Sequence, residues 1–183
     1  MISSMERPPF RTVAMVATVS ALLAAGLAGC GDDGDDADNG EGGSGLTVTS
    51  ATIEEGGEIP ATHACSPGDG ESPPLAFSGI PAEATSLALV MRDETVRYTH
   101  WIVVDIPVTT TEVAAGTPPE GGTVVVGYDP VCPPAGATHT YVWTLYALDG
   151  PAPDPGGNPA SLVFSLPEAA IASGQLTGTY TGS

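Results

Sequence analysis

The clearest pattern in the sequence is a series of short apolar segments separated by turns rich in Gly, Pro and Thr. Each segment combines β-branched, aromatic and aliphatic residues over a length typical of a β-strand. Residues 87–91 and 101–104 are almost continuously apolar, as in strands that are covered on both faces. The pattern predicts strands at residues 46–50, 87–91, 101–106, 124–128, 141–148 and 162–164.

One stretch late in the chain, residues 166–173, has the pattern of a helix. Ser165 and Glu168 have the spacing of a capping box, and Gly174 stands where helices commonly stop. Many short strands with little helix are typical of an all-β domain. We therefore predict an antiparallel Greek-key β-sandwich with one or two short helices.

The N-terminal residues have the pattern of an export signal. Arg7 and Arg11 precede an uncharged apolar run at residues 12–27, which is too short to span a bilayer comfortably. The run ends in Leu-Ala-Gly before Cys30, which resembles a bacterial lipobox. We predict a lipoprotein signal peptide at residues 1–29 and a lipid on Cys30. An ordinary secretory peptide and an uncut signal anchor are the alternatives.

An acidic stretch follows Cys30. Residues 31–45 are all Gly, Asp, Glu, Asn, Ser or Ala, with six acids and nothing that could seed a core. We expect residues 30–45 to be a disordered tether between a membrane-bound lipid on Cys30 and one domain at residues 46–183. The predicted location is the cell envelope. In a Gram-negative organism this means the outer membrane or the periplasmic face, because Gly31 is not the Asp of inner-membrane retention.

The predicted domain is strongly acidic. It holds fifteen Asp and Glu residues, no Lys, and Arg92 and Arg97 as its basic residues. Nucleic-acid binding needs a basic face, and so does adhesion to anionic lipid. The charge therefore excludes nucleic acid as a partner and leaves the lipid on Cys30 as the link to a membrane.

Two cysteines, Cys65 and Cys132, remain once Cys30 is assigned to the lipid. Export brings a protein into an oxidising environment, where two thiols commonly pair. We predict a disulfide between them, with a catalytic thiol and a metal ligand as the alternatives.

Several polar side chains stand where the predicted strands end. Asp93 closes one strand and His100 opens the next, so a hairpin would bring both to one rim. His139 and Tyr141 lie two apart on a strand and so share a face. With backbone N–H groups around Cys132, such side chains can hold a small anion while Asp93 orients a histidine. No motif places a nucleophile beside a base, so we expect recognition rather than catalysis.

The order of these features resembles the phosphatidylethanolamine-binding protein family, and most closely its bacterial, Raf-kinase-inhibitor-like branch. The matching features are Cys65 with Ser72-Pro73-Pro74-Leu75, Asp93, His100-Trp101, Cys132-Pro133-Pro134, and His139-Thr140-Tyr141 before Tyr146-Ala147-Leu148-Asp149. The resemblance implies a β-sandwich with one small pocket for phosphate-like anions. It assigns to that pocket Asp93, His100, Cys132, Pro133, His139 and Tyr141.

Three departures from the family pattern fall near this pocket. Asp-Pro-Asp is replaced by Asp93-Glu94-Thr95, Gly-Pro by Pro130-Val131, and His-Arg-Tyr by His139-Thr140-Tyr141. The changes remove an acid, a backbone N–H and an Arg from positions close to the anion.

These observations favour a membrane-anchored binding module for a small anion, either phosphate or a phosphorylated head group, or for a partner protein that it inhibits. We expect no catalytic residue, no cofactor and no metal. One alternative is a structural envelope domain whose pocket has decayed. The other is a metal-dependent enzyme whose ligands would be His63, His100, His139 and Asp93.

Overall fold

The computed structural model describes residues 45–65 and 70–183, so the predicted signal peptide, Cys30 and the tether up to residue 44 lie outside it. In chain order the elements are β1 (Thr47–Thr49), β2 (Gly57–Glu58), η1 (Ala61–His63), β3 (Leu75–Ser78), β4 (Ser86–Asp93), β5 (Tyr98–Ile106), β6 (Glu112–Val113), β7 (Thr123–Val126), β8 (Thr138–Leu148), η2 (Pro159–Ser161), α1 (Leu162–Ala169) and β9 (Ala170–Thr181). Within the described ranges no helix is both long and apolar enough to cross a membrane.

The strands form two sheets. The larger has the order β2-β9-β8-β4-β5-β7 and the smaller the order β1-β3-β6. The paired strands are antiparallel except β2 and β9, which are parallel. β4 lies between β5 and β8, and this register places the ends of all three strands at one edge.

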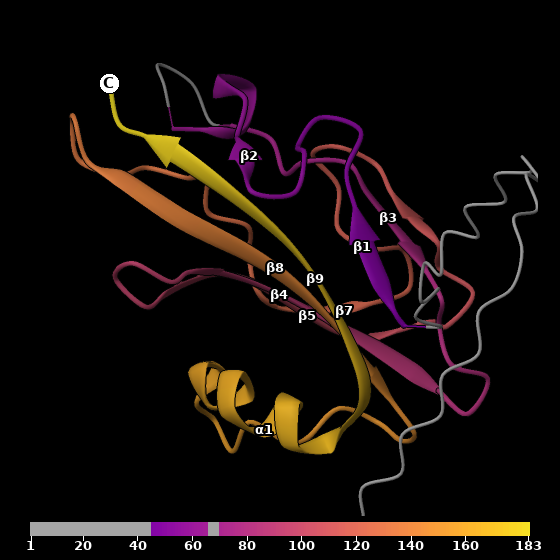
Figure 1. The fold of residues 1–183 in the computed structure, drawn as a ribbon. Helices are drawn as coiled ribbons and strands as arrows, with labels where there is room; N and C mark the ends of the chain where they lie inside the picture. Colours follow the sequence, from indigo (N-terminus) through magenta and orange to yellow (C-terminus); the bar gives the residue numbers. More distant parts are fainter. Residues whose placement is uncertain (1–44, 66–69) are drawn as a thin grey trace, which may run out of the picture. The chain divides into compact units, whose positions relative to one another are not determined.

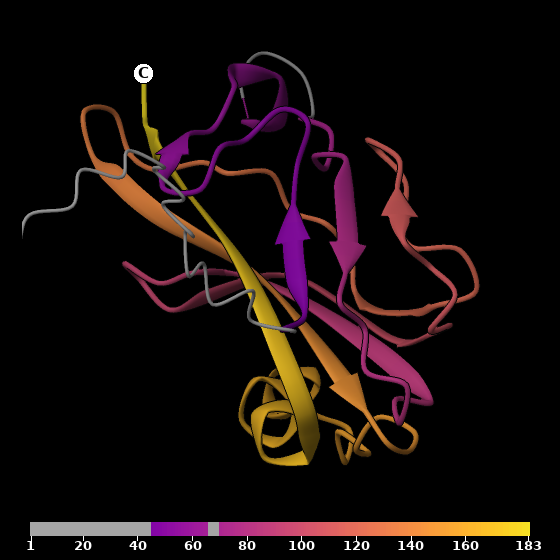
Figure 2. The ribbon, with the colours of Figure 1, turned by 45° about the vertical axis from the view of Figure 1, so that its right-hand side comes forward.

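Both faces of the six-stranded sheet are covered, as the apolar runs at residues 87–91 and 101–104 predict. Figures 1 and 2 show β1 and β3 on one face, and Figure 1 shows α1 on the other. The core between the sheets includes Phe77, Leu89 and Trp143. A second cluster under α1 joins Val90 and Ile102 to side chains of the helix. The predicted fold class is confirmed as a mostly β-sheet sandwich with one short helix.

The C-terminal part differs from the prediction. The residues predicted as a strand, 162–164, begin α1, and the predicted helix at 166–173 runs into β9, the longest strand. The helix is held by Leu162 and Leu166, which are one helical turn apart and both buried. Gly174 is not a helix stop, because it lies in β9, where a Cβ would overlap the backbone of Leu46. The capping box is also wrong, since Ser165 lies inside the helix.

Candidate functional site

The site is built around the hairpin between β4 and β5. Asp93 is the last residue of β4 and pairs with Tyr98 of β5 and with Tyr141 of β8. Its Oδ1 accepts hydrogen bonds from the backbone N–H groups of Thr95 at 2.8 Å and Val96 at 3.2 Å. The carboxylate therefore fixes the turn that leads into β5.

The other oxygen of Asp93 faces His139. Asp93 Oδ2 lies 2.5 Å from Nδ1 of His139, and the two residues are only 2% and 9% exposed. An ionised carboxylate can only accept, so Nδ1 carries the proton. Asp93 thus sets the tautomer and the orientation of this imidazole.

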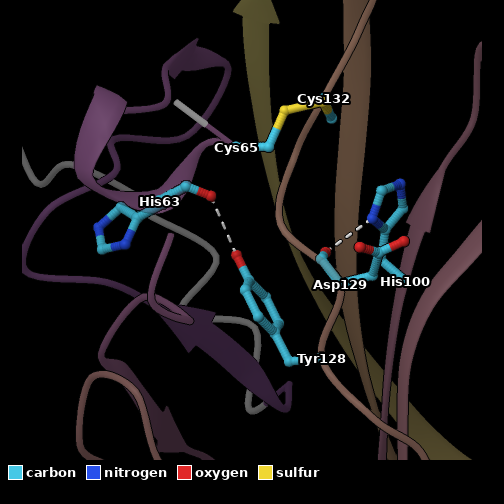
Figure 3. Close-up of a disulfide and its surroundings, with 6 residues drawn as sticks. All are labelled: His63, Cys65, His100, Tyr128, Asp129 and Cys132. Carbon is cyan, nitrogen blue, oxygen red and sulfur yellow. Dashed lines mark hydrogen bonds between the residues drawn. A yellow bond between two sulfur atoms is a disulfide. The ribbon is translucent and has the colours of Figure 1, made fainter. Parts of the chain in front are cut away.

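His100 is held in the same manner by a backbone group. Its Nδ1 donates to the carbonyl of Asp129 at 2.8 Å, and the N–H of Asp129 donates to the carbonyl of His100 at 2.9 Å (Figure 3). Within the described ranges no protein group hydrogen-bonds to Nε2 of His100 or His139. Neither Nε2 is among the fully buried atoms that lack a partner, so both retain some solvent exposure. Both Nε2 atoms are therefore open to solvent in the pocket.

Tyr141 supplies a hydroxyl next to the histidines. Burial, together with the nearby Asp93 carboxylate, raises the pKa of Tyr141 to about 12, although the backbone N–H of Cys132 acts in the opposite direction. The ring of Tyr141 meets that of His100 edge to face, with centroids 5.3 Å apart. At neutral pH the hydroxyl is protonated and serves as a donor.

These side chains line one pocket of about 320 Å³, named here the Asp93 pocket. Its walls are formed by Asp93, Val96, Tyr98, His100, Asp129, Pro130, Cys132, Pro134, His139 and Tyr141. No Arg or Lys is among them, whereas two carboxylates are, so any positive charge in this pocket comes from its imidazoles.

The structure brings together five of the six residues that the sequence assigns to the pocket. The exception is Pro133, which is buried and does not line it, whereas its neighbour Pro134 does. Sequence reasoning missed Tyr98 and Asp129, which are joined by a 3.1 Å bond from the phenol to Oδ2. The alternation of a strand could have found Tyr98, two residues before His100, but nothing in the sequence marks Asp129.

The predicted disulfide is present. Cys65 and Cys132 are bonded, with their Cα atoms 5.3 Å apart (Figure 3). Beside it the N–H of Cys65 donates to the carbonyl of Val131 at 2.9 Å. The bond therefore joins the segment after η1 to a wall of the Asp93 pocket.

His63 belongs to the scaffold and not to the pocket. Its Nδ1 donates to the carbonyl of Glu71 at 2.8 Å, and its Nε2 lies 3.0 Å from the hydroxyl of Thr52. The four-ligand metal set considered from the sequence is thus not assembled. In the described part of the chain, no three His, Cys, Asp or Glu side chains are grouped so that they could hold a metal ion.

Comparisons with known proteins agree with this geometry. The family model named phosphatidylethanolamine-binding protein matches residues 49–181. A Mycobacterium tuberculosis protein that carries the name lipoprotein LppC is 37% identical over 151 residues, which are 75% of this chain and 73% of that protein.

Two solved structures are similar over the same region. A homologue from Chlamydia trachomatis superposes with a TM-score of 0.66 at 33% identity, over 76% of this chain and 99% of that one. YbcL of Escherichia coli, described as a member of the mammalian PEBP family, superposes with a TM-score of 0.65 at 27% identity, over 75% and 99%.

Proposed function

Because the chain belongs to the phosphatidylethanolamine-binding protein family, in its bacterial YbcL-like branch, we propose that its domain binds a small phosphate-like anion in the Asp93 pocket. The anion would be free phosphate or a phosphorylated head group. The binding is non-catalytic: no step of bond making or breaking is part of the proposal.

One observation carries this proposal: the Nε2 atoms of His100 and His139 are both free of protein partners and open into the same pocket. Each imidazole already uses Nδ1 as a donor, so Nε2 donates to an anion only after the ring takes up a second proton. Asp93 Oδ2 occupies Nδ1 of His139, so Nε2 is the nitrogen left for the anion. Tyr141 adds a neutral donor that needs no proton uptake.

The envelope location is part of the same proposal. A relative that is 37% identical carries a lipoprotein name, and the Leu-Ala-Gly-Cys30 sequence has lipobox order. We expect Cys30→Ser to move the protein from the membrane fraction to the soluble fraction, or to leave uncleaved precursor. Unchanged fractionation of this variant would end the lipoprotein proposal without affecting that of the pocket.

A structural envelope domain without a ligand is the second candidate function. It is favoured by the two carboxylates and the missing Arg and Lys in the pocket walls, and by Pro130, which lines the pocket but has no N–H to offer. A partner protein that presents a phosphate-like group would use the same donors as a free head group.

The test is calorimetric titration of the mature domain with inorganic phosphate and with O-phosphorylethanolamine at pH 6. We expect His139→Gln and His100→Gln each to weaken binding about tenfold or more, since each removes a charge-assisted hydrogen bond. His63→Gln is the matched control, because it alters a buried histidine outside the pocket and should leave affinity unchanged. Absence of binding by the folded wild-type domain would favour the structural candidate.

A further inference from the structure

A second pocket, of about 400 Å³, lies beside the first and is named here the Trp101 pocket. Its walls include Glu71, Ser72, Trp101, Pro118, Val124 and Tyr128. Figure 3 shows the two sides of the segment between the pockets: Tyr128 points toward His63, whose carbonyl accepts its hydroxyl, while Asp129 faces His100. The two pockets therefore share this segment as a wall.

The Trp101 pocket lies against an open sheet edge. β7 is the last strand of the six-stranded sheet and pairs only with β5. Beyond that ladder, no hydrogen bond of the described residues involves its backbone. Its sequence, Thr-Val-Val-Val, has no charge and no Pro, the devices that usually protect an edge strand, and Val124 is 46% exposed. The described residues therefore leave this edge available to pair with another strand.

The register of β7 connects this edge with the pocket. Val124 pairs with Val103, whose side chain belongs to the core between the sheets, so the Val124 side chain lies on that same face and lines the pocket. A strand added to the outer edge of β7 would place the residue opposite Val124 on this face too. Its side chain would enter the Trp101 pocket.

The chemistry of the pocket selects the side chain that enters. Among the described residues, Glu71 is the only charged one in its walls. Trp101 forms a buried floor and meets Tyr128 edge to face at 5.5 Å. A guanidinium or ammonium group suits a carboxylate beside aromatic rings. Fifteen acids against two arginines in residues 46–183 also attract a basic partner and repel a second copy of this domain.

We propose that β7 and the Trp101 pocket form a strand-addition site for an extended segment of a basic protein, whose Arg or Lys side chain enters the pocket beside Glu71. Main-chain pairing with β7 would supply affinity, and the pocket would supply specificity. This site is separate from the Asp93 pocket and does not depend on the anion proposed there.

The test uses the capped peptide Thr-Val-Thr-Arg-Thr-Val-Thr, a version with Glu in place of Arg, and an Arg version N-methylated at alternate residues. Fluorescence anisotropy measures affinity, and hydrogen exchange reports the β7 amides. We expect the Arg peptide to bind the wild-type domain, to slow exchange at residues 123–126, and to bind at least about tenfold more tightly than either other peptide.

Matched variants separate the pocket from general charge effects. Glu71→Lys should weaken binding of the Arg peptide at least about tenfold, whereas Glu58→Lys, the same charge change on β2, should have a much smaller effect on its affinity. Val124→Lys should abolish pairing, whereas Ile171→Lys on β9, another exposed apolar position, should not. His139→Gln should leave peptide binding unchanged.

Several results would overturn the proposal. Equal binding of the Arg and Glu peptides would show that the Trp101 pocket does not select the side chain. Equal binding of the N-methylated peptide, or unprotected β7 amides at saturation, would show that the peptide does not pair with β7. A wild-type dimer in sedimentation that Val124→Lys dissociates would identify a second copy as the occupant. If Val124→Lys does not fold, the peptide series and Glu71→Lys still decide the matter.

Discussion

The Asp93 pocket and the Trp101 pocket share the segment at residues 128–132 as a wall, yet they are built differently. Around the Asp93 pocket most polar groups are already fixed: Asp93 holds a turn and an imidazole, and the Asp129 carbonyl holds His100. The Trp101 pocket has one carboxylate, two aromatic rings and an open strand edge beside it. The polar groups of the Asp93 pocket are held in place by the protein itself, whereas the proposed site at the Trp101 pocket would be completed only by the backbone of a partner.

Because the two pockets differ in construction, ligand binding at each should respond to different changes in solution conditions and sequence. The proposed anion binding at the Asp93 pocket would depend on protonation, because any positive charge there resides on imidazoles. The proposed peptide binding at the Trp101 pocket would depend on main-chain hydrogen bonds and on the Glu71 carboxylate.

The disulfide is the perturbation that should affect both pockets. Cys65 and Cys132 close a loop with a sequence separation of 67 residues, which corresponds to about 4 kcal/mol of stability in the chain-entropy model. We expect reduction to lower the melting temperature by about 10 °C. It should also weaken ligand binding at both pockets, since the bond ties a wall of the Asp93 pocket to the segment next to the Trp101 pocket. Calorimetric scans with and without reductant measure this, and the double Cys→Ser variant should no longer respond to reductant.

Asp93→Asn should affect one pocket only. The change leaves an acceptor for the Thr95 and Val96 N–H groups but removes the charge facing His139, at a cost of about 3 kcal/mol in unfolding free energy. Phosphate affinity should fall about tenfold while binding of the Arg peptide stays unchanged. Denaturant titration and calorimetry measure both, with Glu94→Gln as the neighbouring charge control. A parallel loss of peptide binding would show that the two sites are coupled.

Tyr141 should affect the free energy of unfolding at high pH. Its pKa is raised from 10.0 to about 12 in the folded domain, so its contribution to stability is complete below pH 10 and is lost as pH rises from 10 to 12. Ionisation should remove about 2 kcal/mol, and Tyr141→Phe should flatten this alkaline loss. Urea unfolding at pH 9 and pH 11 should show about 1 kcal/mol of this loss, because pH 11 lies midway between the two pKa values. Tyr180→Phe on the neighbouring strand β9 is the control; a loss that Tyr141→Phe leaves unaltered would contradict the assignment.

The two sites should also differ in how their ligand affinities depend on pH. Affinity for sulfate should be greater at roughly pH 5.5 than at pH 7.5, because an imidazole donates from both nitrogens only when it is protonated. The Arg peptide should bind equally at both values, since its proposed site uses main-chain groups and a carboxylate and no imidazole. Calorimetry at the two pH values tests this, and a flat sulfate profile would leave Tyr141 and backbone groups as the only donors.

The central strands and the β4–β5 hairpin were predictable because burial on both faces leaves a continuous apolar signal. β9 was not, since its Ala, Ser, Gly and Thr residues carry no such pattern. What makes it a strand is its pairing with β8 along the whole strand, together with Gly174 and Gly178, which allow close packing. The local sequence pattern of a strand does not show whether another segment of the chain will pair with it.

The candidate site was predictable to the extent that its groups are side chains at strand ends, as Asp93 and His100 are. The carbonyl of Asp129 was not, because a backbone acceptor has no sequence signature. Pro134 lines the pocket in place of the expected Pro133, because neighbouring residues of an extended loop face opposite ways and the sequence does not say which faces inward.

The position of the disulfide also determines how the domain would bear mechanical load. A force applied at its N-terminal end would act first on β1, which pairs with β3 over three residues, and on β2, which pairs with β9 over two. After these detach, tension would pass at Cys65 through the covalent bond to Cys132, bypassing the chain from β3 to β7. Pulling at this end would therefore detach a short N-terminal segment while the chain between Cys65 and Cys132, which holds the walls of the Trp101 pocket, bears no tension. The Asp93 pocket would bear load, because Cys132 is one of its walls.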